Sequence, residues 1–449
     1  MEALQLQQHG LAFRDRPPLF LPAVPGETPG SGLLVHDDPV EARGELQVVS
    51  DDGGYARWRG FVDEIRPTVT EILEAPPPLL GHDAPLMPLL EQAWRVRRRG
   101  AASMIEALKV ATMSAEDWLL EYVAHPRLRA GLALGALVGT FMGPRSPQSA
   151  GVLLLREAIA GREIVGGPAR LAEALLAGAR QREVTIRTSA PVEEIRVEGG
   201  AVRGVVLRGG ETIDAPVVVS GLDPRRTLLD LVAPTELPPR VEDEVRALRT
   251  RAPSAKLHLA LSKAPEFTCR ERQFERIRVA GDTVRIERAF DDAKHRRLPE
   301  HPPLDVRVPS VADPTLAPPG HHVLSAHVFG VPYAPDGGWS ASAREQLLDR
   351  ALAVLAEVAP SLPKSVVAAE LLVPPEIEAR YGVTGGHPMH GEHALDQLWV
   401  GRPGPLLSRH ATPIRGLYLG CGGTHPYGGA SGAAGVWAAR RVVDAAGAP

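Results

Sequence analysis

A short apolar run that leads into a glycine-rich loop and a small-residue helix constrains this 449-residue chain more than any other feature. The run covers residues 416–420, and the helix is expected from about 431 to 445. Because glycine lacks a Cβ atom, the loop's N–H groups can approach a flat or anionic ligand, and a helix N-terminus favours negative charge. Spacing alone leaves two interpretations open, a ligand-binding loop or a tight strand-to-helix turn without a ligand.

The first third of the chain predicts mostly helices. Residues 11–35 are expected to be extended and rich in loops. From about 39 to 160, apolar side chains recur at helical spacing, as at Phe61, Ile65 and Val69.

The remainder predicts strands mixed with helices. A helix that opens at Pro168 is expected to turn Leu171, Leu175 and Ala179 inward. Strands and one further helix follow from β-branched runs, alternation and apolar spacing. The expected strands are 184–186, 192–197, 202–207, 217–219, 255–261 and 322–329, with an Arg-rich, turn-rich stretch between the last two, and the helix is 341–359. The expected fold class is α/β (α+β).

Composition narrows the function classes. A formal charge of -4 and a pI near 6.4 give no general attraction to nucleic acid, so no nucleic-acid partner is expected. The two cysteines, Cys269 and Cys421, exclude a disulfide framework and fit a cytoplasmic location. No secretory signal pattern opens the sequence, and the apolar stretch 132–142 is too short to span a bilayer. Contact with a membrane surface stays open, and the excess of Arg, Ala, Gly and Pro favours a bacterial gene.

Three parts of the chain carry a resemblance to a known family. The first is the loop and helix at 416–435; the second runs from 166–171 through 192–195 to 220–225. Together they resemble the flavin-binding segments of the phytoene-desaturase-like FAD-dependent oxidoreductases. The third, at 374–378, 385–392 and 395–398, is similar to the branch typified by pyridine nucleotide-disulfide oxidoreductase domain-containing protein 2. The resemblance extends along essentially the whole chain.

This resemblance implies two interleaved domains. An FAD-binding domain of incomplete Rossmann-like form would comprise 161–235 and 402–449, and a substrate domain, a mixed sheet covered by helices, would comprise 11–160 and 236–401. The implied cofactor is FAD, which would accept a hydride equivalent from a C–C or C–N bond of an apolar small molecule.

The resemblance also implies site residues. The cofactor-binding candidates are Val192, Gly420, Gly422, Gly423, Gly429, Ser431 and Gly432. The catalytic candidates are His390, Glu392 and His425, although hydrogen bonding within the turn is an equal alternative for His425. His387, His390 and His393 are spaced by three, but the glycines around them indicate a loop without fixed ligand geometry, so we expect no metal.

The sequence also departs from the family. The family begins with a βαβ unit whose Gly-x-Gly-x-x-Gly turn holds the pyrophosphate, and no such motif occurs in this sequence. We expect this unit to be absent, through a downstream start codon or through loss. Cys421 and Tyr427 also stand where the family keeps glycines. The rival hypotheses are a truncated, non-catalytic relative that binds a lipid or protein partner without FAD, and an amine-oxidase-like flavoenzyme.

Overall fold

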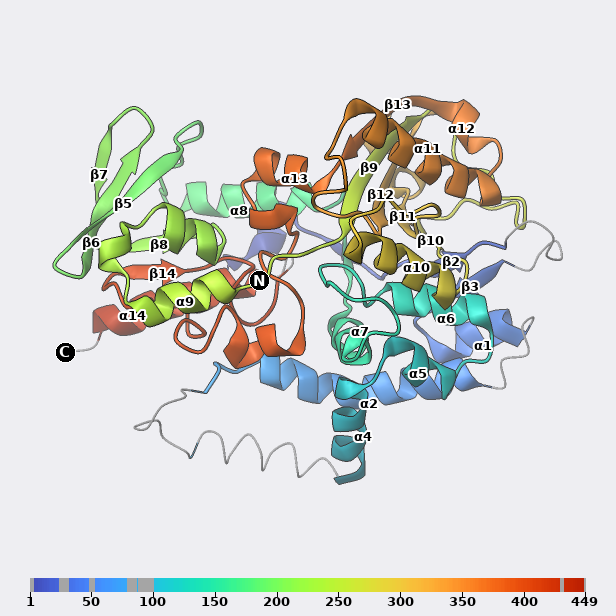
Figure 1. Cartoon of the computed structure of the whole chain (residues 1–449), viewed down its shortest axis with the longest axis horizontal. Helices are drawn as coiled ribbons and strands as arrows, with labels where there is room; N and C mark the ends of the chain where they lie inside the picture. The colour runs from blue at the N-terminus through green and yellow to red at the C-terminus, as the bar shows by residue number, and fades with distance from the viewer. Residues whose placement is uncertain are drawn as a thin grey trace.

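The chain forms two lobes, seen side by side in Figure 1. The computed structural model describes residues 4–23, 32–47, 53–78, 87, 101–428 and 432–447, with backbone alone at 101–104. The larger lobe surrounds a seven-stranded sheet, and the smaller one holds the short strands β5–β8 and β14. This mixture of helices and mixed sheets is the predicted α/β (α+β) class. The predicted domain boundaries stay predictions.

The seven-stranded sheet has the order β13-β9-β12-β11-β10-β2-β3, and its pairs are antiparallel except β10 with β2. Its strands are β2 (Leu19–Leu21), β3 (Leu33–Val35), β9 (Ser254–Leu261), β10 (Arg276–Val279), β11 (Leu304–Arg307), β12 (His322–Phe329) and β13 (Val366–Leu372). Alternation puts apolar residues on one face, which packs against α11 (Ala341–Val358) to form one core. On the other face, β9–β12 carry mostly polar side chains, whereas β2 and β3 carry apolar ones that belong to a second core.

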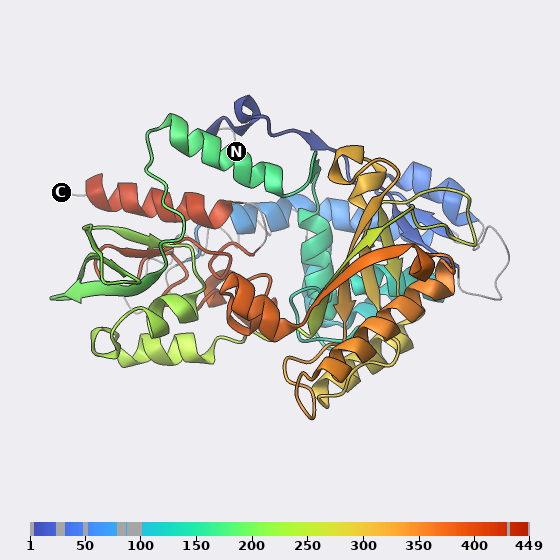
Figure 2. The same ribbon diagram turned by 90° about the horizontal axis from the view of Figure 1, so that it is seen from above.

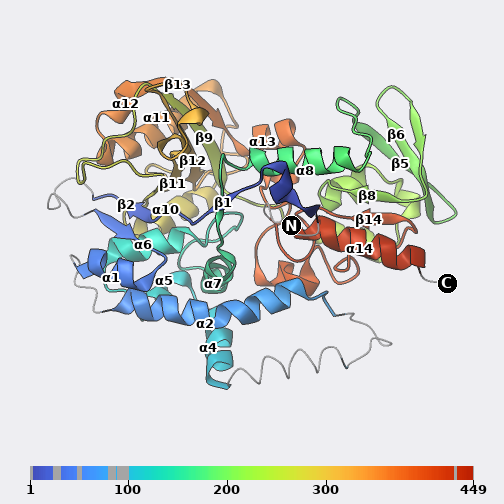
Figure 3. The same cartoon turned by 180° about the vertical axis from the view of Figure 1, so that it is seen from behind.

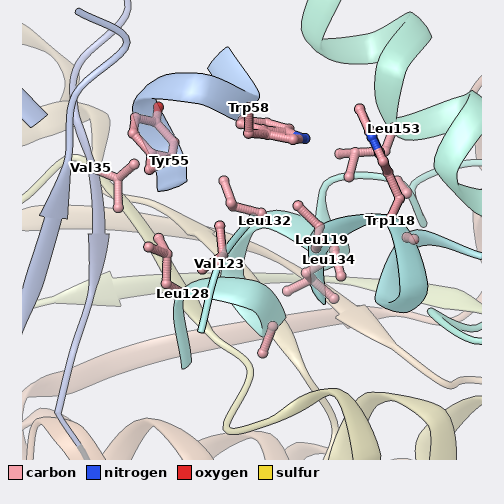
Figure 4. Close-up of a cluster of buried hydrophobic side chains, with 14 of the residues drawn as sticks. Val35, Tyr55, Trp58, Trp118, Leu119, Val123, Leu128, Leu132, Leu134 and Leu153 are labelled. Carbon is pink, nitrogen blue, oxygen red and sulfur yellow. The ribbon is translucent and has the colours of Figure 1, made fainter. Parts of the chain in front are cut away.

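Helices cover the larger lobe on the side away from α11. They are α1 (Pro39–Leu46), α2 (Gly54–Glu74), α4 (Ala101–Thr112), α5 (Ala115–Leu120), α6 (Pro126–Leu134) and α7 (Ser149–Ile159), as the helical spacing predicts. Figure 4 shows their shared core, in which Trp58 and Trp118 are fully buried. Two large aromatic side chains fix how α2 and α5 pack, because rings this size leave few alternative arrangements.

The Arg-rich stretch before β12 is more regular than the sequence predicts. It contains β10, α10 (Thr283–Lys294) and β11. Arg276 and Arg278 alternate with buried Ile277 and Val279, so the stretch is a strand whose inner face is charged. The arginines concealed the alternation, because charged residues on a buried strand face are rare.

The smaller lobe contains an antiparallel meander and a parallel strand pair. Its main elements are α8 (Ala169–Gln181), β5 (Val192–Glu198), β6 (Ala201–Leu207), β7 (Thr212–Asp214), β8 (Val218–Ser220), α9 (Pro239–Ala247), β14 (Leu417–Leu419) and α14 (Ala433–Gly447). β8 pairs with β14 in parallel. Figure 3 shows α14 and α8 on the same side of this lobe. The remaining elements are β1 (Phe13–Arg14), β4 (Glu163–Ile164), α12 (Leu362–Ser365) and α13 (Pro374–Tyr381).

Two predictions in this lobe are wrong. Residues 184–186 form no strand, and Val184 and Ile186 are 53% and 42% exposed. A strand needs a neighbour for its N–H and C=O groups, and no described strand lies beside them. In α8, Leu171 packs inward as predicted, but the buried residues are Ala174 and Gly178, and Leu175 is 40% exposed. Small residues occupy the buried side of α8 because the turn at Leu6–His9 packs closely against that side.

Candidate functional site

The candidate site begins at the end of strand β14, where Gly420 lies between strand β8 and helix α14. β14 is buried along its length and lies parallel to β8, so both strands end at the same edge. A Cβ atom at Gly420, directly after β14, would lie 3.2 Å from Val219 Cγ1 and 3.3 Å from Ala438 Cβ. Glycine is therefore needed here for helix α14 to pack against the strand pair.

The next glycines allow contact with another loop. A Cβ atom at Gly423 would lie 2.7 Å from the carbonyl oxygen of His390, and one at Gly422 would lie 3.7 Å from His390 Cγ. One at Gly428 would lie 2.7 Å from Cβ of Met389. The structure thus brings His390 together with Gly422 and Gly423. These glycines accommodate polypeptide on the side that faces His390.

Gly432 is different. A Cβ atom there would meet no atom within 4 Å, and its φ of 68° lies in the left-handed region that favours glycine. It immediately precedes the 15-residue helix α14. This position is open to a ligand. Gly429 and Ser431 lie outside the described residues, and Val192 is half-buried at the start of β5, paired with Leu207. A contact of Val192 with adenine stays a prediction.

Two buried charged groups, absent from the predicted site, hold these loops together. The fully buried guanidinium of Arg402 donates to the carbonyl oxygens of Met389 (2.6 Å) and Gly422 (2.7 Å). Asp223, just after β8, accepts from the backbone N–H of Thr384 at 3.0 Å. Their sequence neighbours give no signal for this role, because it depends on loops that meet only in the folded chain.

Glu392 is buried but carries two ion pairs. Its carboxylate lies 3.1 Å from Arg249 and 3.2 Å from Arg251, and its side chain is 3% exposed. A carboxylate held in this way is an anchor between the 387–392 loop and the segment before β9. It is poorly placed to contact a substrate, because the side chain is buried between two arginines.

His425 is fully buried and faces α2. Its Nε2 lies 2.9 Å from the carbonyl oxygen of Ala75, at the end of that helix, and its Nδ1 has no described partner. Burial lowers the pKa of His425 to about 4, so the ring is neutral at pH 7 and donates its one N–H to Ala75. Hydrogen bonding explains this residue, although the partner belongs to α2 and not to the turn itself.

The remaining histidines of the loop form a neutral cluster. His387 and His393 are buried, and His393 Nδ1 lies 3.2 Å from a guanidinium nitrogen of Arg156 on α7. Burial, followed by the charge of Arg402, lowers the pKa of His387 to about 3 and also lowers that of His393. Within the described residues no three His, Cys, Asp or Glu side chains are grouped as a metal site requires.

The polar face of the seven-stranded sheet carries further titratable residues that the site prediction did not include. Lys256 on β9 lies directly across from His327 on β12, which in turn lies across from Asp305 on β11. Burial lowers the pKa of Lys256 to about 8 and that of His327 to about 4. An amine with that pKa exchanges protons near neutral pH. The alternation of polar residues within 255–261 was a usable signal for this face.

Comparison with known proteins settles the family. The family described as flavin containing amine oxidoreductase matches residues 40–436, most of the chain. This chain belongs to the flavin-containing amine oxidoreductase family. It is 30% identical to pyridine nucleotide-disulfide oxidoreductase domain-containing protein 2 of Rattus norvegicus, over 98% of this chain and 81% of that protein. The lycopene-forming phytoene desaturase of a Paracoccus strain is 25% identical, over 85% of this chain and 72% of the relative.

A solved structure has the same fold. An A394C mutant of putrescine oxidase superposes with a TM-score of 0.53 at 15% identity, covering 99% of this chain and 84% of the other. The predicted family, the fold and an FAD-dependent oxidoreductase activity are thereby confirmed.

FAD is the cofactor of this family member, and some of the described residues would fit it. The parallel β8–β14 pair and the open position of Gly432 before α14 fit a group that needs close backbone approach. The described residues contain no Gly-x-Gly-x-x-Gly turn to hold the pyrophosphate. In the described part of the chain, no helix is both long and apolar enough to cross a bilayer.

Proposed function

We propose that this flavin-dependent oxidoreductase oxidises an apolar small molecule. The observation that carries the proposal is the parallel strand pair β8–β14, followed by the glycine loop and the open position of Gly432, in a chain of a flavin-containing family. FAD, when bound, takes up the hydride equivalent that the substrate loses. The relative named for phytoene, a hydrocarbon, supports an apolar substrate.

The protein's own groups would contribute position and exclusion of water. Arg402 fixes the loop of Met389 and His390 against Gly422, so the side chains of that loop are held beside the glycine loop. Neutral His387, His393 and His425 add no charge there, which suits an apolar molecule.

An amine is the second candidate substrate. The family's description as amine oxidoreductases favours it, and a C–N bond would be oxidised instead of a C–C bond. Turnover of unsaturated hydrocarbons compared with turnover of primary amines distinguishes the two.

The first experiment is the visible absorption spectrum of the purified chain, before and after FAD is added and the excess removed. We expect a flavin band that stays with the protein. Gly432→Val should abolish it, because the new side chain fills the open position and strains a left-handed φ. Gly338→Val is the matched control, since Gly338 has a φ of 74° and open surroundings in a distant loop.

A folded wild-type chain that retains no flavin would contradict cofactor binding by these segments and favour the non-catalytic rival. Loss of the band in both glycine variants would show general strain and not a flavin contact.

We also propose a cytoplasmic location with transient contact at a membrane surface, where an apolar substrate would be available. Cys269 and Cys421 are both free and buried, which fits a reducing compartment. Fractionation of cells that express the chain tests this, and recovery only from an oxidising compartment would contradict it.

A further inference from the structure

The inner face of the seven-stranded sheet is a layer of charged and polar side chains. Cross-strand pairing aligns Arg278, Asp305, His327 and Lys256 in one row. A second row contains Arg276, Arg307, Ser325 and His258. In Figure 2, α7 lies on the opposite side of this sheet from α11, so the layer faces the interior between the sheet and α7.

Most members of this layer keep partial exposure, although they lie inside the larger lobe. Asp305, Arg307, Ser325, His327 and Lys256 are half-buried, whereas the apolar residues that alternate with them are buried. Burial nevertheless dominates the lowered pKa values of Lys256 and His327. The layer therefore combines partial exposure of its side chains with desolvation of its charged groups.

Among the arginines of this layer, Arg276 is the one without a hydrogen-bond or ion-pair partner in the described residues. It is 4% exposed, its Nε makes no hydrogen bond, and no described residue forms a hydrogen bond or ion pair with its guanidinium. Its neighbours are paired: Arg278 with Asp305 at 3.0 Å, and Arg307 with Glu163 at 2.6 Å. An unpaired buried cation is costly, so a protein that keeps one gains from an anion supplied from elsewhere.

The carboxylate that attracts Arg276 through space does not neutralise it. Glu157 on α7 is already held by Arg16 at 3.3 Å and by Arg59 at 3.0 Å. Burial, together with the charges of nearby arginines, lowers the pKa of Arg276 to about 9. One unit of positive charge therefore remains without a counterion in this part of the layer.

We propose that Arg276 binds the carboxylate of the substrate, so that the substrate is an apolar molecule that ends in an organic acid. This inference rests on the proposed function. The planar guanidinium presents two parallel N–H groups that match the two oxygens of a carboxylate.

Further residues connect the polar layer with the glycine loop. Beyond the layer, Arg156 on α7 contacts His393 at 3.2 Å, and the loop that contains His393 packs through His390 against Gly423. The anion site and the candidate flavin site thus lie at two ends of one connected set of residues. Arg276 would anchor the far end of the molecule while its oxidisable bond lies near the glycine loop.

The test uses the full chain and sodium octanoate as the probe, with thermal unfolding and calorimetric titration as readouts. Octanoate should stabilise the wild type, while octan-1-ol, with the same chain but no charge, should not. Arg276→Met should weaken octanoate binding on the order of 10- to 100-fold, as expected for loss of a charge-assisted hydrogen bond. The octanoate affinity of Arg276→Lys should lie between those of the wild type and Arg276→Met. Arg272→Met, at an exposed position nearby in sequence, should bind octanoate like the wild type.

Several outcomes would overturn the proposal. These are equal octanoate binding by Arg276→Met, equal stabilisation by octan-1-ol, or stronger stabilisation by inorganic phosphate. Without ligand, Arg276→Met should unfold at the same temperature as the wild type or higher, because an unpaired buried charge is removed. A lower temperature would show that Arg276 supports the fold instead.

The result is separable from the proposed function. Flavin retention is measured by the visible spectrum and octanoate binding by heat, so each can fail alone. A chain that retains FAD but ignores octanoate keeps the proposed function and loses this inference. A chain that binds octanoate through Arg276 without FAD gives the reverse.

Discussion

At the scale of single residues, neighbours decide what a titratable side chain can do. Glu392 was a catalytic candidate in the sequence, yet it lies between Arg249 and Arg251 and is nearly inaccessible. His425 was another candidate, and its ring is occupied by the carbonyl of Ala75. Both side chains connect segments that are distant in sequence, so their replacement should affect stability first.

Glu392→Gln should therefore lower the free energy of unfolding by about 2 kcal/mol, because a buried charge pair is broken while both arginines keep some solvent. Asp396→Asn is the control: it removes another carboxylate that pairs with Arg249, but one that is 60% exposed, and should cost at most about 0.5 kcal/mol. Urea unfolding measures both. Equal effects of the two variants would contradict the anchoring role of Glu392.

At the scale of elements, the site depends on two loops that meet. The glycine loop after β14 and the 387–392 loop touch through backbone atoms, and Arg402 donates to a carbonyl in each. Contacts between backbones tolerate no added carbon, unlike contacts between flexible side chains.

Gly423→Ala should displace the 387–392 loop, because its new methyl group would lie 2.7 Å from the carbonyl oxygen of His390 and from Pro224 Cδ. We expect a loss of about 2 kcal/mol in stability, typical of overpacking, and faster proteolysis of that loop. Gly435→Ala on α14, where no atom lies within 4 Å, should instead stabilise by about 0.5–1 kcal/mol through helix propensity. Urea unfolding and limited proteolysis measure these effects. A Gly423→Ala variant with the stability and the proteolysis rate of the wild type would contradict the predicted clash.

At the scale of the whole molecule, buried neutral histidines couple stability to pH. His387, His425 and His327 lie on different segments, and burial lowers the pKa of each to between about 3 and 4. In the unfolded chain a histidine titrates near 6.5, so below that pH the unfolded state binds protons that the folded state does not.

The free energy of unfolding should therefore be highest above pH 6.5. It should fall as the pH drops toward 4, by up to about 1.4 kcal/mol per pH unit for each histidine. His425→Asn should reduce this slope, whereas His295→Asn, at an exposed position, should leave it unchanged. Urea unfolding at several pH values between 5 and 7 measures the slope. A wild-type slope equal to that of His425→Asn would show that His425 is not buried in the neutral form.

The sequence by itself determined the local elements and the family. Apolar spacing predicted the helical block now seen as α1, α2 and α4–α7 and the helix α11, and the glycine-rich run predicted the passage from β14 to α14. These features depend on periods of 3.6 and 2 residues and on glycine chemistry, which are readable along the chain. Residues 184–186 failed this test, because strand propensity without a neighbouring strand makes no strand.

The tertiary structure alone decided which side chains act together. It paired Glu392 with two arginines, turned His425 toward α2, and placed Arg402 between two loops. It also aligned polar residues from four strands into one inner face and left Arg276 there without a partner. Partnership, desolvation and pKa depend on residues that are distant in sequence, so no local pattern encodes them.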